Sequence, residues 1–128
     1  MAYIGPVQRW DLFTVDLEPA VGREQRGVCR PALVVSNNGF NRHFDIVTVV
    51  PLTGLRKKKR RVYPFEVLLP AAVAGNPKDS ILMPHQVRTV SKLRLGDLLG
   101  SLADVDLRIQ VENRLLEHLG IDFEAEGL

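Results

Sequence analysis

The chain has 128 residues, of which 45% are hydrophobic and 25% are charged, proportions that are ordinary for one globular domain spanning residues 1–128. No apolar stretch approaches the ~20 residues of a membrane span, and the first residues lack the apolar core of a secretory signal. Cys29 is the only cysteine, which excludes an internal disulfide and a cysteine-based zinc cage. We therefore expect a cytoplasmic protein that does not associate with membranes.

The formal net charge of +2 hides an asymmetry along the chain. Residues 1–103 carry 15 Lys and Arg against 8 Asp and Glu, whereas residues 104–128 carry 2 against 7. Six cations stand together in RKKKRR, at residues 56–61. Such a run is typical of a solvated hairpin tip or of a loop that attracts nucleic-acid phosphates, and composition alone favours the first interpretation.

Short apolar runs separated by turn residues predict strands over most of the chain. In chain order these strands are expected at residues 11–17, 32–36, 45–53, 63–70 and 80–90. The second, ALVVS, is continuously apolar, as in a strand that is buried on both faces. Between them, residues 18–31 form a long polar loop, and NNGFN at residues 37–41 has the composition of a turn.

The hydrophobic period changes after the last strand and predicts a helix at residues 104–119. Its apolar stripe recurs every four residues and consists of Leu107, Val111, Leu115 and Leu119. Asp104 or Asp106 suits the N-cap, Gly120 suits the end of the helix, and residues 120–128 form an acidic tail. About five strands and one helix predict a mainly β, α+β fold, in which a helix crosses a small, strongly bent antiparallel sheet or partly open barrel.

Familiar catalytic and metal-binding spacings are absent from the sequence. The three histidines, His43, His85 and His118, do not form a zinc-binding motif, and no glycine-rich nucleotide-binding motif occurs. His43 and His85 could act as the acid and base of a ribonuclease if the fold brought them together, whereas His118 suits the C-terminal end of a helix. We therefore expect no metal and no cofactor.

Arg30 stands at the head of the predicted buried strand, directly before Pro31. Burying a guanidinium group is costly unless it is paired, so this side chain needs a partner. Pro31 biases Arg30 toward extended geometry, which would hold the guanidinium as a bidentate phosphate clamp. A salt bridge to Glu24 or Asp16 is the structural alternative, and sequence spacing does not separate the two.

The segment DLFTVDLEPAVGREQRGVCRPALVVSNNGFN, residues 11–41, resembles the opening of the MazF/PemK toxin family. The segments VVPLT, YPFEVLL and DSILMPHQVRTV resemble the later blocks of that family in the right order, so the resemblance runs from about Arg9 to about Leu119. There are departures: Trp10 stands where the family usually has glycine, His85 replaces a common aspartate, and the Glu-Gln to Arg-Pro spacing is one residue longer than in many members.

The resemblance implies an SH3-like barrel with a C-terminal helix that forms a homodimer. It implies a sequence-specific, metal-independent endoribonuclease that cuts single-stranded RNA, chiefly mRNA, and leaves a 2′,3′-cyclic phosphate and a 5′-hydroxyl. It also implies a cognate antitoxin whose disordered, often acidic segment occupies the RNA groove.

The roles of Arg30 and Thr53 follow from the same resemblance, and those of the other candidates follow from their chemistry and their place in the sequence. Arg30 matches the catalytic arginine of the family and Thr53 its catalytic threonine, and both would stabilise charge on the phosphate. Glu24 is expected to orient Arg30 or to accept the 2′-hydroxyl proton, and Gln25 to bind a base edge or a phosphate. The expected RNA-binding residues are Lys57, Lys58, Arg60, Gln86 and Arg88.

Two other functions fit the same small barrel. One is a non-enzymatic toxin that binds a protein, as the CcdB gyrase inhibitors do, and the other is a basic RNA-binding barrel without catalysis. A phosphate clamp argues against the first, because a protein-binding surface does not need one. Phe40 and Tyr63 could stack on RNA bases or pack in the core, and the sequence leaves both possibilities open.

Overall fold

The computed structural model describes residues 3–55 and 61–122. Its seven strands are β1 (Asp11–Val15), β2 (Arg30–Val34), β3 (Ile46–Gly54), β4 (Val67–Leu69), β5 (Ser80–Leu82), β6 (Arg88–Ser91) and β7 (Leu95–Ser101). The described helices are α1 (Asn38–His43) and α2 (Val105–Leu119), with the 3₁₀ turns η1 (Val73–Gly75), η2 (Pro84–Gln86) and η3 (Lys92–Arg94). Neither α1 nor α2 has the length and apolar character needed to cross a membrane.

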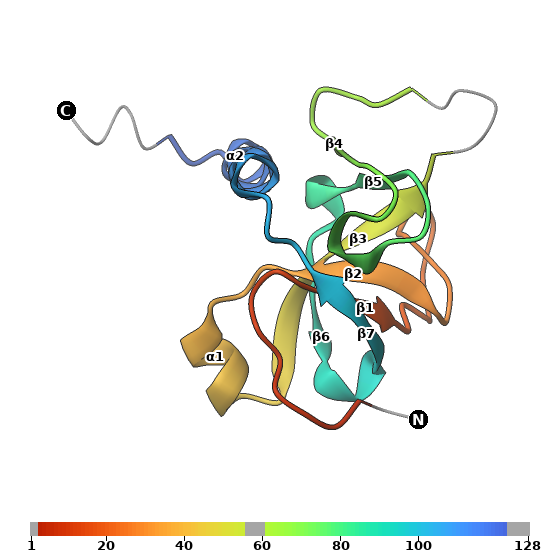
Figure 1. The fold of residues 1–128 in the computed structure, drawn as a ribbon, viewed down its shortest axis with the longest axis vertical. Helices are drawn as coiled ribbons and strands as arrows, with labels where there is room; N and C mark the ends of the chain where they lie inside the picture. The colour runs from red at the N-terminus through yellow and green to blue at the C-terminus, as the bar shows by residue number, and fades with distance from the viewer. Residues whose placement is uncertain (1–2, 56–60, 123–128) are drawn as a thin grey trace.

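The strands form one strongly bent antiparallel sheet in the order β4-β5-β3-β2-β1-β7, with β6 also beside β3 (Figure 1). β3 bends so that Ile46–Val49 pairs with β6 and Leu52–Gly54 pairs with β5. Pro51 lies between these halves, where its missing N–H interrupts the regular ladder. The sheet does not close, since β4 and β7 stand at its two ends and do not pair in the described structure. The predicted bent, partly open antiparallel architecture is therefore confirmed.

Both faces of the central strands are buried. Leu12, Leu33 and Val50 stand side by side in register and belong to one hydrophobic cluster, whereas Phe13 and Val34 belong to the other. Successive side chains of a strand point to opposite faces, so each strand contributes to both clusters. Ala32, Leu33 and Val34 are thus buried on both faces, as predicted, whereas residues 35–36 of the predicted strand lie beyond the end of β2 and are only partly buried.

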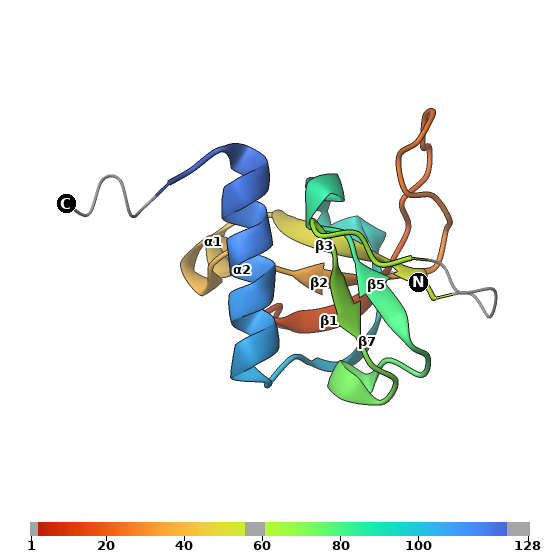
Figure 2. The same cartoon turned by 90° about the horizontal axis from the view of Figure 1, so that it is seen from above.

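α2 covers the cluster that contains Leu12, and Val111 is its buried contact (Figure 2). The Asp104 side chain accepts a hydrogen bond from the Leu107 N–H at 3.1 Å, and Gly120 ends the helix in the left-handed conformation at φ +71°. These caps confirm the predicted boundaries. The predicted apolar stripe is buried only in part, because Leu119 is exposed.

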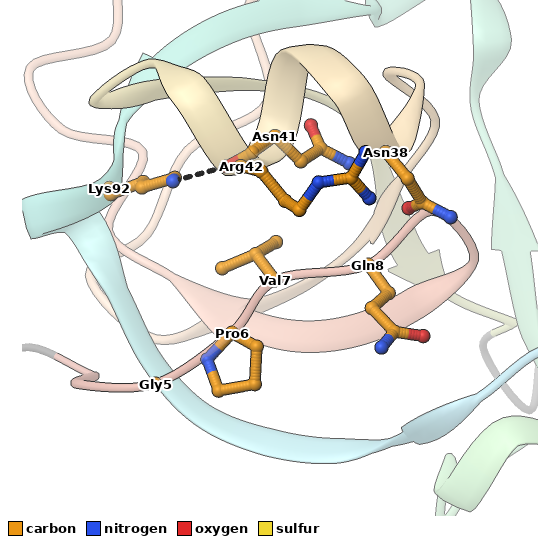
Figure 3. A pocket seen from close by; sticks show the side chains of 8 residues that line it. All are labelled: Gly5, Pro6, Val7, Gln8, Asn38, Asn41, Arg42 and Lys92. Atoms are coloured by element: carbon orange, nitrogen blue, oxygen red, sulfur yellow. Dashed lines mark hydrogen bonds between the residues drawn. The ribbon is translucent and has the colours of Figure 1, made fainter.

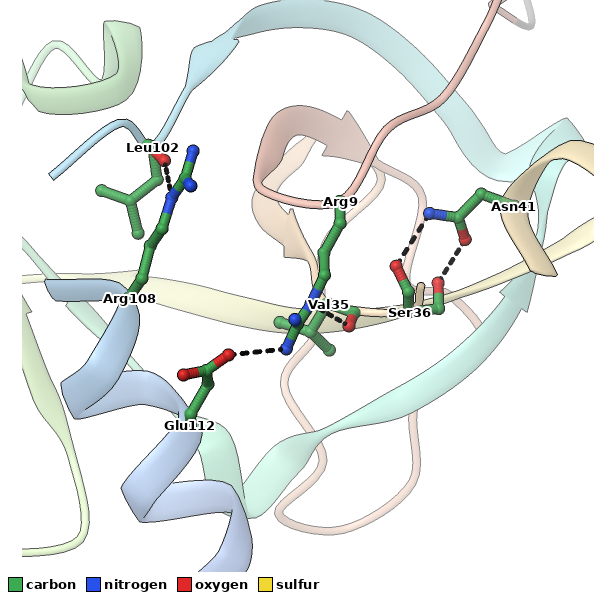
Figure 4. Close-up of polar contacts among 7 residues, drawn as sticks. All are labelled: Arg9, Val35, Ser36, Asn41, Leu102, Arg108 and Glu112. Atoms are coloured by element: carbon green, nitrogen blue, oxygen red, sulfur yellow. Dashed lines mark hydrogen bonds and ion pairs between the residues drawn. The ribbon is translucent and has the colours of Figure 1, made fainter. Parts of the chain in front are cut away.

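Two arginines help to fasten α2 to the sheet (Figure 4). Arg9 forms an ion pair with Glu112 of α2 at 3.2 Å, and Arg108 of α2 donates to the carbonyl of Leu102 at 2.7 Å. Both guanidinium groups also lie over the buried indole of Trp10, 4.5 and 5.4 Å from its ring centroid. Trp10 has φ +77°, a conformation that favours glycine, and these contacts hold the large side chain in place.

One predicted turn is a short helix. Residues 37–41 were expected to form a turn, but α1 begins at Asn38. The Asn37 side chain accepts a hydrogen bond from the Phe40 N–H at 2.8 Å and acts as the N-cap. Asparagine suits a helix cap as well as a turn, which explains the wrong prediction.

The predicted strand pattern also differs in the second half of the chain. Residues 80–90 form two strands, β5 and β6, separated by η2, and only β4 forms within residues 63–70. β7 was not predicted, because its glycines weaken the strand pattern. A Cβ on Gly100 would lie 2.4 Å from the Ala74 carbonyl oxygen, so this glycine permits the close approach of β7 and η1.

Candidate active site

Arg30 and Thr53 line one pocket of about 350 Å³. Arg30 is the first residue of β2, and Thr53 lies near the end of β3. The pairing of β2 with β3 ends with Ala32 opposite Pro51, and beyond this point Arg30 pairs with Val15 of β1 and Thr53 with Ile81 of β5. Both side chains nevertheless line the same pocket, at the point where the two strands diverge. The fold thus brings the two predicted catalytic side chains together.

The polar groups of both side chains are left unused by the described part of the protein. The Nε of Arg30 is buried without a hydrogen-bond partner, and no ion pair joins Arg30 to Glu24 or Asp16 among the described residues. The Thr53 hydroxyl makes no hydrogen bond within the same part of the chain. The alternative role for Arg30, a salt bridge to Glu24 or Asp16, is therefore not found among the described residues. Since buried polar groups normally have partners, the pocket suits an anionic ligand that accepts from both.

Gly27 supports the aliphatic part of the Arg30 side chain. A Cβ on Gly27 would lie 2.5 Å from Cγ and 2.6 Å from Cδ of Arg30, and its φ of +122° also favours glycine. The Gly27 N–H donates to the Glu18 carboxylate at 2.7 Å, and its carbonyl accepts from the Leu17 N–H at 2.8 Å. The N–H groups of Gly27 and Ala20 lower the pKa of the Glu18 carboxyl, the Gly27 bond being the larger cause. The loop between β1 and β2 is thus fastened where it touches Arg30.

Four further polar residues line this pocket and are not among the predicted site residues: Thr14, Asn76, Lys78 and Ser80. The Asn76 amide donates to the Lys78 carbonyl at 2.5 Å and to the Ser80 hydroxyl at 2.9 Å, and both Asn76 and Ser80 are buried. These bonds fold the turn that carries the exposed Lys78. A second cation therefore stands at the pocket of Arg30, although only the turn composition of this segment was evident in the sequence.

A second pocket of about 330 Å³ brings together four other predicted residues, Glu24, Gln25, Gln86 and Arg88. Pro51 lines this pocket and the next residue, Leu52, lines the first, so the two pockets are neighbours along β3. The Gln25 side chain donates to the Leu52 carbonyl at 3.1 Å and connects them. Glu24 is exposed here and lies apart from the pocket of Arg30.

Gln86 binds the loop between β1 and β2 through both ends of its amide. Its oxygen accepts from the Gln25 N–H at 2.8 Å, and its nitrogen donates to the Arg23 carbonyl at 2.9 Å. Arg88 donates to the Leu17 carbonyl at 3.2 Å. The loop extends away from the side of the molecule where α2 lies (Figure 2), and η2 holds its middle while β6 holds its start through these contacts. Lys57, Lys58 and Arg60 lie outside the described residues.

A third pocket, of about 320 Å³, lies between the N-terminal segment and α1 (Figure 3). Its Lys92 ammonium donates to the Asn41 carbonyl, and the buried Asn41 amide donates to the Ser36 carbonyl at 2.8 Å (Figures 3 and 4). No predicted site residue lines this pocket. The Arg30–Thr53 pocket is the stronger candidate, because the described fold does not use its arginine and threonine side chains.

The donors of the first pocket suit a phosphodiester. A guanidinium fork, a hydroxyl and an ammonium group supply several donors and positive charge to the oxygens of one phosphate. Within residues 3–55 and 61–122, no group of three or more His, Cys, Asp or Glu side chains is placed to hold a metal ion.

Comparisons with known proteins point to one family. The family model of the PemK-like, MazF-like toxin of type II toxin–antitoxin systems matches residues 8–119. Endoribonuclease EndoA of Bacillus subtilis (strain 168) is 35% identical over 116 residues, which cover 87% of this chain and 97% of the relative.

Solved structures agree in fold. MazF from Deinococcus radiodurans has a TM-score of 0.76 at 27% identity, covering 92% of this chain and 100% of the other. An endoribonuclease from Mycobacterial species, in complex with its cognate antitoxin, has a TM-score of 0.71 at 26% identity, covering 91% and 97%. The chain therefore belongs to the family of PemK-like, MazF-like toxins of type II toxin–antitoxin systems.

Proposed function

We propose that this protein is an endoribonuclease toxin that cuts single-stranded RNA, chiefly mRNA, at short sequence motifs. The observation that carries the proposal is the guanidinium of Arg30 beside the hydroxyl of Thr53 in one pocket, where neither is paired with another described residue. The similarity of the chain to EndoA, which is named as an endoribonuclease, supports the proposal. A CcdB-like protein-binding toxin is not favoured, because protein binding leaves this phosphate clamp without a purpose.

In the proposed reaction a ribose 2′-oxygen attacks the adjacent phosphorus and the bond to the 5′-oxygen breaks. The products are a 2′,3′-cyclic phosphate and a 5′-hydroxyl, which takes up one proton as the 2′-hydroxyl loses one. Charge increases on the non-bridging oxygens in the transition state. Arg30 holds two of these oxygens with its fork, and Thr53 and Lys78 add a donor and a charge. Arginine remains charged at any working pH, so Arg30 acts as a clamp and not as a base.

The second pocket would bind the RNA beside the scissile phosphate. Glu24 is exposed there, apart from Arg30, and is our candidate to accept the 2′-hydroxyl proton from the strand. Gln25, Gln86 and Arg88 would shape this surface. Lys57, Lys58 and Arg60 would bind further phosphates with low sequence specificity.

We further propose a cytoplasmic homodimer that a cognate antitoxin inhibits. The mycobacterial endoribonuclease was solved with its antitoxin, and the 15 cations against 8 acids of residues 1–103 suit an acidic antitoxin segment. Light scattering after size-exclusion chromatography measures the oligomeric state directly.

The test of the proposed activity is cleavage of a long single-stranded RNA by the purified protein in EDTA. We expect cuts at a limited set of sites, with 2′,3′-cyclic phosphate ends detected by mass spectrometry, and no cuts in DNA of the same sequence. A folded protein that leaves RNA intact, or that needs added magnesium, would contradict the proposal.

A further inference from the structure

A row of aromatic side chains lies on the surface next to the second pocket. The rings of Tyr63 and Phe65 are parallel within 3°, with centroids 5.4 Å apart, and the two side chains are 43% and 45% exposed. The Arg61 guanidinium lies 5.8 Å from the Tyr63 centroid, and the His85 ring meets Phe65 at 80° and 4.7 Å. We call Arg61, Tyr63, Phe65 and His85 the aromatic row.

The backbone beneath the aromatic row is held firmly. The Tyr63 N–H donates to the Glu66 carboxylate at 3.0 Å, and the Glu66 N–H donates to the Tyr63 carbonyl at 2.9 Å. Glu66 is buried, and Arg114 of α2 donates to the Pro64 carbonyl at 3.4 Å. Two exposed rings are therefore presented by a fastened turn, which lowers the entropy cost of binding to them.

Phe65 and His85 also form one wall of a pocket of about 320 Å³ against α2. The rest of its lining is Arg114, Glu117 and His118, and Arg114 forms an ion pair with Glu117 at 2.9 Å. The Nε of Arg114 is buried without a hydrogen-bond partner among the described residues. An aromatic wall with donors and acceptors around it is the arrangement that binds a flat heteroaromatic ring, because the ring stacks while its edge hydrogen-bonds.

We propose that the aromatic row and this pocket form a subsite for one unstacked nucleobase of the RNA, and this proposal rests on the proposed RNA-cleaving function. His85 lines both this pocket and the second pocket, so the subsite continues the surface on which Glu24 and Arg88 lie. The RNA strand would pass from the clamp at Arg30 across the second pocket and place a flanking base at Phe65.

A nucleotide fits this surface better than a protein segment does. Arg61 lies over the Tyr63 ring and Arg114 lines the pocket beside Phe65, and a nucleotide brings a phosphate and polar base edges to such groups. An apolar protein segment would remove the Arg114–Glu117 ion pair from water and leave the Nε of Arg114 without a partner, which is costly. Single-stranded RNA is commonly recognised by stacking of its splayed bases on such rings.

The test measures binding of a short, mixed-sequence, fully 2′-O-methylated RNA by fluorescence anisotropy. This probe has no free 2′-hydroxyl and is not cut, so binding is measured whether or not the protein is an active nuclease. Phe65→Ala should weaken binding about 5- to 150-fold, since base stacking is worth about 1–3 kcal/mol. Phe65→Tyr should bind like the unchanged protein. Phe44→Ala is the matched control, because Phe44 is 55% exposed and stacks on Phe40 in a separate aromatic pair.

A 2-aminopurine base moved along the probe should lose fluorescence at one position, and Phe65→Ala should restore it. If Phe65→Ala does not fold, Phe65→Leu takes its place, since leucine keeps the apolar contact and lacks the ring. Binding by Phe65→Ala or Phe65→Leu equal to that of Phe44→Ala would overturn the proposal. A Phe65 variant that binds RNA normally but no longer forms the dimer or binds the antitoxin would assign the aromatic row to a protein interface. That result would overturn the proposal as well. A protein that binds the probe through Phe65 but cuts no RNA would contradict the proposed activity and leave the subsite standing.

Discussion

Arg30 and Thr53 line the same pocket, and neither side chain makes a hydrogen bond or an ion pair with another described residue. The fold places them together without using their polar groups. Substitutions of these two side chains should therefore affect the reaction much more than the stability of the protein. Substitutions of neighbouring residues should affect cleavage by moving the Arg30 side chain.

Gly27 tests that positioning role. In Gly27→Ala the new Cβ would lie 2.5 Å from Cγ of Arg30, so the arginine side chain must move. A displacement of about 1 Å costs up to about 100-fold in rate, and we expect a loss of that order in kcat/KM on RNA with the protein still folded. Gly22→Ala is the matched control, because Gly22 also has a positive φ, +60°, but its Cβ would meet nothing within 4 Å. Equal losses in the two variants would mean that loop strain, and not Arg30, is responsible.

Gln86 tests whether the loop between β1 and β2 must be fastened. Gln86→Ala removes the bonds to the Gln25 N–H and the Arg23 carbonyl. We expect cleavage to fall by a similar factor at every site, with the cut sites unchanged. Gln86→Glu keeps the acceptor for Gln25 and should retain more activity. Sequencing of the 5′-hydroxyl ends measures both quantities, and a new set of cut sites would show instead that Gln86 reads a base.

Trp10 tests the backbone conformation at the start of β1. Trp10→Ala and Trp10→Gly should both lower the free energy of unfolding by about 3–5 kcal/mol, since a large buried side chain is removed. The glycine variant should be more stable than the alanine variant by about 1 kcal/mol, because φ is +77° at this position. Urea unfolding measures the difference. An alanine variant as stable as the glycine variant would contradict the observed conformation.

Local signals in the sequence were enough to predict some features. Asp104 and Gly120 are caps whose meaning depends on neighbouring residues alone, so the bounds of α2 were predicted well. Arg30 is a candidate from the sequence alone, because a charged residue at the head of a buried strand needs a partner. Asn37 carried a local signal too, but asparagine fits both a turn and a helix cap.

Other features depend on contacts between distant parts of the chain. β7 exists because it pairs with β1, and its glycines obscure that role in the sequence. Arg30 and Thr53 lie in one pocket because their strands are neighbours in the sheet, and Lys78 joins them through the fold of a turn. Gln86 was expected at the RNA, and only the tertiary structure shows its amide bonded to the loop.

The RKKKRR segment yields a prediction from the sequence alone, since residues 56–60 lie outside the described structure. If Lys57, Lys58 and Arg60 bind phosphates, replacing all three with serine should flatten the slope of log affinity against log salt by about 0.7 for each phosphate that is no longer neutralised. The cut sites should not move, because phosphates carry no sequence information. Arg42→Ser, an exposed cation of α1, serves as the control. Parallel lines for the triple variant and the unchanged protein would remove these residues from the RNA-binding surface.

The most direct measurement is a double-mutant cycle on Arg30→Ala and Thr53→Val, with single-turnover cleavage of one RNA in EDTA. Because both side chains are proposed to hold the same phosphate, Arg30→Ala should slow cleavage by at least about 100- to 1,000-fold with little change in thermal stability. The double variant should be less impaired than the product of the two single effects, since residues that act as a unit are not additive. Cleavage by Arg30→Ala within about tenfold of the unchanged protein, or effects of the two substitutions that simply multiply, would contradict a shared phosphate clamp.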